Sequence, residues 1–135
     1  MAEELIIKCC APTLAGLKLG SIFCLGNYCK DMGRELKRCV DILKSKGLEV
    51  KGTKGCKGQR LIYVYRPEEL KSMVSEKCNA CLLNSFGYNT NDTNETVKYL
   101  LDKIRYQEEF PHEIGLFLGY PPEDVIGYIE NNGKN

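Results

Sequence analysis

The sequence predicts an α+β fold, in which a small antiparallel sheet of about three strands is packed by helices and the C-terminal third is all helical. Three observations carry this prediction: an amphipathic stretch after Asn27, a glycine-rich turn between two strand-like runs at 48–66, and prolines that begin helices in the C-terminal third. The length of 135 residues fits a single domain over 1–135.

The N-terminal half begins with short apolar segments. Residues 3–10 are apolar enough for a short helix or strand, which Pro12 ends because proline lacks a backbone donor. The next apolar run predicts a strand at 18–25 that is buried on both faces. Apolar residues then recur at spacings of three and four, which predicts a helix at 28–46 with Asn27 as its N-cap.

A hairpin and two helices follow. The runs 48–54 and 60–66 flank a glycine-rich turn, and the second run is rich in β-branched and aromatic residues, which favours paired strands. A proline and two acids then begin a helix at 67–77, because proline suits the first helical position and acids suit the positive end of the helix dipole. Residues 78–86 form a second short helix that ends at Gly87.

The C-terminal third has the caps and the periodicity of helices. Asp92 and Glu95 cap a helix with a clear apolar stripe. The stripe consists of Val97, Leu100, Leu101 and Ile104. Pro111 and Pro122 each look like a first helical residue, which predicts short helices at 111–118 and 122–131.

These two C-terminal helices carry more large apolar side chains than they need to cover one another, so some should pack on the sheet. The apolar residues are Phe110, Ile114, Phe117, Leu118, Val125, Ile126 and Ile129. Tyr120 and Tyr128 suit the border of this packing or of a protein interface. The acidic residues should face outward and pair with the basic hairpin, within one molecule or across a weak homodimer. They are Glu108, Glu109, Glu113, Glu123, Asp124 and Glu130.

The net charge of +1 conceals an uneven distribution of charge. Residues 28–77 carry 13 basic and 7 acidic side chains, whereas residues 78–135 carry 4 basic and 9 acidic ones. The turn of the predicted hairpin contains basic residues and no acid, so it is a candidate for binding a phosphate or another ligand. The candidate ligand-binding residues are Lys51, Lys54, Lys57 and Arg60. The alternative is a solvated turn whose lysines protect an edge strand.

The eight cysteines include two closely spaced pairs, which suit a tetrahedral thiolate site for a metal. These metal candidates are Cys24, Cys29, Cys78 and Cys81. The alternative is that Cys24 and Cys29 are buried as small hydrophobic residues, and no cofactor is required by the sequence. A thioredoxin-like redox role for the CxxC at 78–81 requires a strand-to-helix context with the first thiol at the helix N-terminus, and the sequence lacks the strand. The acidic start and the lack of a long apolar run predict a cytoplasmic protein with reduced thiols.

A second group of candidates contains the only histidine. If His112 reaches Cys9 or Cys10, the pair forms a thiolate and an imidazole suited to nucleophilic chemistry, and Thr13 adds a hydroxyl. These residues are the candidate catalytic set. The alternative is that His112 lies in an exposed first helical turn and that Cys10 belongs to the core.

Three segments resemble a known family. They are CAPTLAGLK at 10–18, LIYVYR at 61–66 and EFPHEIGLFLGYPPEDVIGYIEN at 109–131. They are similar to the uncharacterised bacterial family catalogued as domain of unknown function 3793, which is found largely in anaerobic Firmicutes. The resemblance covers most of the chain, and it implies no activity that can be transferred to this protein.

The sequence therefore favours a small cytoplasmic binding or adaptor domain with a protein or small-molecule partner. Each of its candidate catalytic or nucleotide-binding motifs is explained better by a structural role. The alternative function is a thiol-dependent enzyme or metal-handling protein that uses Cys9 or Cys10 with His112. Nucleic acid is a poor partner, since the helix after Pro122 begins with acids that DNA phosphates would repel. We expect a monomer or a weak homodimer and no membrane span.

Overall fold

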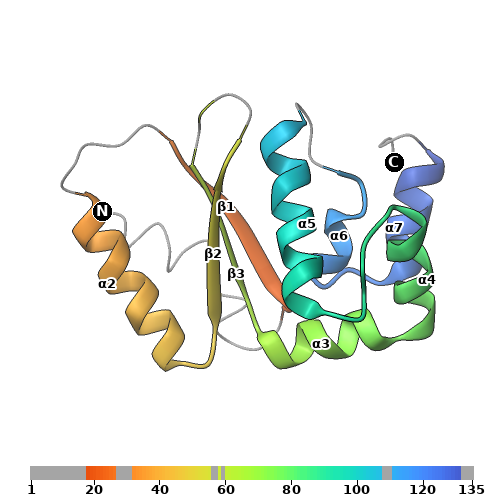
Figure 1. The fold of residues 1–135 in the computed structure, drawn as a ribbon, viewed down its shortest axis with the longest axis horizontal. Helices are drawn as coiled ribbons and strands as arrows, with labels where there is room; N and C mark the ends of the chain where they lie inside the picture. Colours follow the sequence, from red (N-terminus) through yellow and green to blue (C-terminus); the bar gives the residue numbers. More distant parts are fainter. Residues whose placement is uncertain (1–17, 27–31, 56–57, 59, 108–110, 132–135) are drawn as a thin grey trace.

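The structure is a computed structural model that describes residues 18–26, 32–55, 58, 60–107 and 111–131. A three-stranded antiparallel sheet is packed by helices, and the C-terminal region is helical (Figure 1). In chain order the elements are β1 (Gly20–Gly26), α2 (Met32–Ser45), β2 (Glu49–Lys54), β3 (Arg60–Tyr65), α3 (Pro67–Ser75), α4 (Lys77–Ser85), α5 (Thr93–Tyr106), α6 (Ile114–Phe117) and α7 (Pro122–Glu130).

The central strand of the sheet is β3, because the strand order is β1-β3-β2. Both neighbours run antiparallel to it, and Tyr63 lies opposite Ile22 on β1 and opposite Lys51 on β2. Every residue of β3 after Arg60 is buried, as expected of a strand that is covered on both faces.

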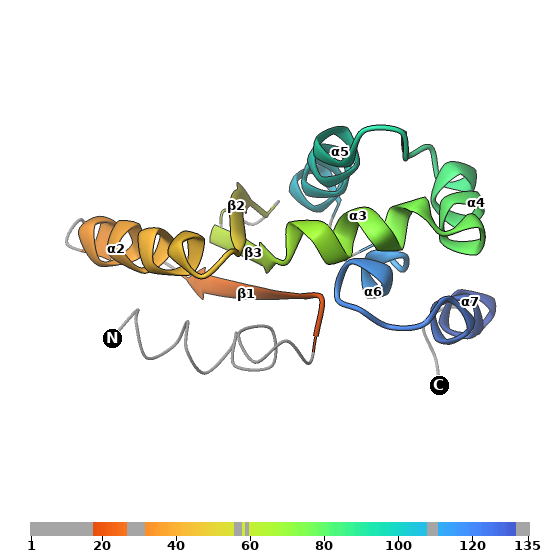
Figure 2. The same ribbon diagram turned by 90° about the horizontal axis from the view of Figure 1, so that it is seen from below.

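The two faces of β3 pack against different helices. Side chains alternate along a strand, so Leu61, Tyr63 and Tyr65 point to one face while Ile62 and Val64 point to the other. The first three belong to the core that the C-terminal helices complete. Helix α2 covers the opposite face of the sheet from α5 (Figures 1 and 2).

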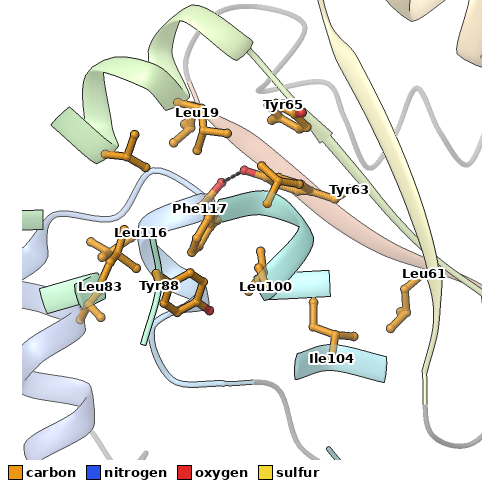
Figure 3. Close-up of a cluster of buried hydrophobic side chains, with 14 residues drawn as sticks. Leu19, Leu61, Tyr63, Tyr65, Leu83, Tyr88, Leu100, Ile104, Leu116 and Phe117 are labelled. Atoms are coloured by element: carbon orange, nitrogen blue, oxygen red, sulfur yellow. Dashed lines mark hydrogen bonds between the residues drawn. The ribbon is translucent and has the colours of Figure 1, made fainter. Parts of the chain in front are cut away.

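A contact between the sheet and α6 fixes the centre of this core. The Tyr63 hydroxyl donates a hydrogen bond of 2.7 Å to the backbone carbonyl of Phe117, which is fully buried (Figure 3). Gly20 allows this approach, since a Cβ atom there would lie 2.8 Å from both the Phe117 oxygen and a Tyr63 ring carbon. The expectation that part of the C-terminal helical surface packs on the sheet is thereby confirmed.

The predicted strands, and the helices predicted from caps and prolines at 67, 92 and 122, are confirmed. The predicted hairpin forms β2 and β3, and the predicted strand at 18–25 forms β1. The Asp92 carboxylate accepts hydrogen bonds from the amides of Asn94 and Glu95, so it caps α5 as expected. Pro67 and Pro122 begin α3 and α7. The predicted segment 3–10 and Asn27 lie outside the described residues.

The prediction of a helix that begins at Pro111 is wrong. Helix α6 contains only Ile114–Phe117, and the segment before it is a turn. The physical cause of this turn is the buried side chain of Glu113, which is 2% exposed. Glu113 forms an ion pair with Lys103 on α5 and accepts a hydrogen bond from Tyr88 on the loop before α5. The expectation that Glu113 faces outward in an exposed first turn is therefore also wrong.

The length and apolar character of the described helices fall short of those of a membrane-spanning helix. Across the residues for which the structure gives a position, no helix combines the length and the apolar character that a bilayer span requires.

Candidate binding groove between helices α6 and α7

A groove of about 670 Å³ lies between α6 and α7. Its apolar lining comes from Ile114, Leu118 and Val125, and its polar lining includes Glu123 and Asp124. This volume falls within the range of roughly 300–1,000 Å³ that is usual for small-ligand sites. The groove therefore has the size and the mixed lining of a binding site.

Glycines allow α6 and α7 to approach one another. A Cβ atom at Gly115 would lie 3.0 Å from the Val125 side chain, so a larger residue there would push the helices apart. Gly119 has a φ of +98°, a conformation that favours glycine, and it reverses the chain after α6. The Tyr120 amide then donates a hydrogen bond of 2.9 Å to the Gly115 carbonyl. This turn places Tyr120 at the edge of the groove.

Aromatic rings border the groove. Tyr120 is 51% exposed and Tyr128 is 39% exposed, so both rings are accessible to a ligand. The His112 ring packs edge-on against Tyr128, with 5.3 Å between the ring centroids. The Lys18 ammonium lies 5.6 Å from the centroid of the Tyr120 ring, so this ring already accepts a cation.

The carboxylates of the groove are available for a ligand. Glu123 and Asp124 are exposed in the first turn of α7, and neither forms an ion pair with any residue in the described part of the chain. The basic residues Lys51, Lys54 and Arg60 likewise form no ion pair with a described acid. The intramolecular pairing expected between the acidic helices and the basic hairpin is therefore not seen among these residues.

His112 is the one member of the predicted catalytic set whose position is described. It is half-buried and lines the groove. Cys9, Cys10 and Thr13 lie outside the described residues, so the predicted pairing of His112 with a thiol stays a prediction.

The basic hairpin residues are exposed. Lys51 and Lys54 lie on β2 and Arg60 begins β3, with Lys54 directly opposite Arg60 in the sheet register. Two like charges at such a position are destabilising unless an anion or solvent intervenes. Lys57 lies outside the described residues. The prediction that this hairpin binds an anion stays a prediction.

The described metal-candidate cysteines come from two elements that lie apart. The backbone of Cys24 belongs to β1, whereas Cys78 and Cys81 are exposed on α4, and β1 and α4 lie apart in both views (Figures 1 and 2). Cys29 lies outside the described residues. Within the described ranges, no three His, Cys, Asp or Glu side chains are grouped so that they could hold a metal ion.

A buried polar cluster beside the groove was not predicted. The Glu113 carboxylate forms an ion pair with Lys103 on α5 and accepts a hydrogen bond of 2.9 Å from the Tyr88 hydroxyl. The Lys103 ammonium also lies 5.2–5.7 Å from the ring centroids of Phe86, Tyr88 and Tyr99. None of these residues lines the groove. Because Glu113 lies just before α6 and Lys103 lies on α5, their ion pair fixes the segment before α6 against α5 and thereby positions one wall of the groove.

One signal in the sequence points to this cluster. On α5, Lys103 follows Leu100 by three residues and precedes Ile104 by one, so it lies on the edge of the apolar stripe. A lysine at such a position needs a partner when it is buried. The identity of the partner, Glu113, depends on a contact across the fold.

Three buried tyrosines have raised pKa values. Burial raises the pKa of Tyr63 well above its usual value of 10, and burial together with the charge of Glu49 raises the pKa of Tyr65 to about 12. Burial also raises the pKa of Tyr88, and the charge and hydrogen bond of Glu113 raise it further. The folded state therefore keeps these protons at pH values where the unfolded chain loses them.

Stability should fall in alkaline solution. Above about pH 10 the unfolded state binds fewer protons, so each such tyrosine lowers the free energy of unfolding by about 1.4 kcal/mol per pH unit. For Tyr65 this loss ends near pH 12. Below about pH 10 these tyrosines add no pH dependence, because they are protonated in both states. Urea unfolding at a series of pH values measures the slope.

The control for this expectation uses two phenylalanine variants. Tyr88→Phe removes one of the three buried tyrosine hydroxyls and should make the alkaline slope shallower, whereas Tyr106→Phe changes a ring that is 74% exposed and serves as the control. Equal slopes in the wild type and in Tyr88→Phe would contradict the role of Tyr88.

The chain thus belongs to the class of small α+β proteins with a helical groove beside a three-stranded sheet. The model of the family described as protein of unknown function (DUF3793) matches residues 6–135. The chain is a member of this family, as the three resembling segments indicated. No curated protein and no solved structure gives a significant match.

Proposed function

We propose that this protein is a small cytoplasmic binding domain that captures a positively charged side chain of a partner in the α6–α7 groove. The observation that carries the proposal is the Lys18 ammonium over the Tyr120 ring, at the edge of a groove that also contains two unpaired carboxylates. This contact supports a cationic ligand, because the ring already binds the same kind of group.

The chemistry of the groove suits a lysine or arginine side chain. A ring face attracts a cation by about 0.5–1 kcal/mol at exposed sites and by more when water is excluded. Glu123 and Asp124 add charge attraction, and Ile114, Leu118 and Val125 can cover the aliphatic stem of the side chain. The acidic rim also disfavours nucleic acid as the partner.

The free thiols of Cys78 and Cys81 support a cytoplasmic location. Both side chains are exposed and unpaired in the described structure, and such thiols persist where the compartment is reducing.

Titration with short charged peptides tests the proposal. We expect tetralysine to shift the NMR amide signals of Gly115, Gly127 and their neighbours, and to bind more weakly as salt rises, because salt screens the carboxylates. Tetraglutamate should leave these signals unchanged. A shift centred on Glu68, Glu69 and Glu76, which line a separate acidic hollow, or no shift at all, would refute the proposal.

Substitutions at Gly127 provide the matched variants. A Cβ atom at this position meets nothing within 4 Å, so Gly127→Ala should fold and gain roughly 0.5–1 kcal/mol of stability from its higher helix propensity. Gly127→Leu should fold equally well while its side chain fills the groove and blocks tetralysine. Unchanged tetralysine binding by Gly127→Leu would place the ligand elsewhere.

A further inference from the structure

Two exposed cysteines lie in the first turns of α4. Cys78 is the second residue of this helix and Cys81 is the fifth, and both thiols are free and open to solvent. Cys39, by contrast, is only 5% exposed. Reagents in solution can therefore reach the α4 pair while Cys39 is protected.

The helix brings the two cysteines within the range of a disulfide. Residues three apart on an α-helix share one face, and their Cα atoms are roughly 5 Å apart from the helix geometry. Disulfides join Cα atoms that are about 4.4–6.8 Å apart. The backbone of α4 thus satisfies the first requirement for a bond between Cys78 and Cys81.

Asn79 holds this turn of α4 in a fixed orientation. Its side chain is 4% exposed, and its Nδ2 donates hydrogen bonds to the Met73 carbonyl at 3.0 Å and to the Glu76 carboxylate at 3.4 Å. Asn79 points inward. Cys78, one position before it, and Cys81, two positions after it, therefore point away from the core. The anchor therefore keeps both thiols on the outer face of the helix.

We propose that Cys78 and Cys81 form a reversible disulfide by exchange with a low-molecular-weight disulfide. One thiolate attacks a sulfur of the disulfide R–S–S–R, which forms a mixed disulfide and releases R–S⁻. The second thiolate attacks the protein sulfur of the mixed disulfide, which forms the Cys78–Cys81 bond and releases a second R–S⁻. Two cysteines are oxidised, R–S–S–R is reduced, and the two thiol protons pass to the solvent or to the released thiolates.

The bond should be easy to reduce again. Cβ atoms three residues apart on a helix are about 5–6 Å apart, whereas a disulfide prefers about 3.5–4.5 Å. The turn of α4 between Cys78 and Cys81 must therefore tighten when the bond forms. A disulfide that stores strain has a more oxidising potential, so this pair suits a redox-responsive site better than a structural link.

Equilibration with glutathione tests the proposal on the full-length protein. After incubation in mixtures of oxidised and reduced glutathione, free thiols are blocked with a maleimide and the protein is digested with trypsin. Cleavage after Lys77 and Lys98 releases both cysteines in the peptide 78–98, which contains no other cysteine. We expect the mass of this peptide to fall by two hydrogens and the peptide to carry no maleimide. When reduced glutathione is in excess, the peptide should return to its reduced, maleimide-labelled form.

Three further readouts make the result decisive. The peptide 39–44 contains only Cys39 and should stay free of glutathione, which shows that the protein remains folded. Cys78→Ser and Cys81→Ser should each stop at a glutathione adduct on the remaining cysteine. Two glutathione adducts on the wild-type peptide 78–98, or no oxidation of that peptide in excess oxidised glutathione, would overturn the proposal.

Discussion

Glu113→Gln should lower the free energy of unfolding by up to about 3–5 kcal/mol, because it leaves the partly buried ammonium of Lys103 without its partner. Glu113 is 2% exposed and the Lys103 side chain is 16% exposed, so water can compensate little of the lost charge. Glutamine keeps the shape of the side chain and can still accept the hydrogen bond from Tyr88. The decrease in the free energy of unfolding therefore measures the contribution of the Glu113 charge. Urea unfolding near neutral pH determines this decrease.

A second substitution separates the charge from the packing. Lys103→Met keeps most of the apolar stem of the side chain and removes the ammonium, so the double variant Glu113→Gln with Lys103→Met should be more stable than Glu113→Gln alone. A loss of less than about 1 kcal/mol for Glu113→Gln would mean that the pair acts like an exposed salt bridge.

Phe117→Ala should have an effect of similar size, about 3–5 kcal/mol, because it opens a cavity where the sheet meets the helices. The Phe117 side chain is fully buried, and its ring lies 6.4 Å from the Tyr63 ring and 5.6 Å from the Tyr88 ring between centroids. Its loss removes contacts to both the strand and the buried cluster. The midpoint of urea unfolding should shift accordingly.

The matched control for this cavity is Ile42→Ala on α2. Ile42 is 41% exposed, so its truncation should change stability by no more than about 0.5 kcal/mol. If Phe117→Ala and Ile42→Ala cost the same, the core that joins α6 to the sheet would not be a main source of stability.

The parts of the fold that the sequence predicted are those with local causes. The hairpin follows from a glycine-rich turn between strand-forming runs, and the start of α5 follows from the Asp92 cap. In each case the residues that decide the structure lie within a few positions of one another, so the pattern can be recognised without knowledge of the fold.

The start of α6 and the environment of Glu113 could not be predicted in this way. Proline at position 111 and an acid two residues later are typical of a first helical turn. The ion pair with Lys103 and the hydrogen bond from Tyr88 override that preference, and they join residues 10 and 25 positions apart. The groove depends on the same kind of contact. The sequence predicted that Glu123 and Asp124 face outward and that Tyr120 and Tyr128 lie at a border, but it did not predict the groove itself.

The hydrogen bond from Tyr63 to Phe117 has a consequence for biosynthesis. Its two residues are 54 positions apart, and a ribosome adds about 5–20 residues per second. The strand that carries Leu61, Tyr63 and Tyr65 is thus made roughly 3–10 seconds before the helix that covers this face. During that interval the nascent chain exposes an apolar strand surface, so its safe completion depends on synthesis speed and on chaperones as well as on the stability of the finished fold.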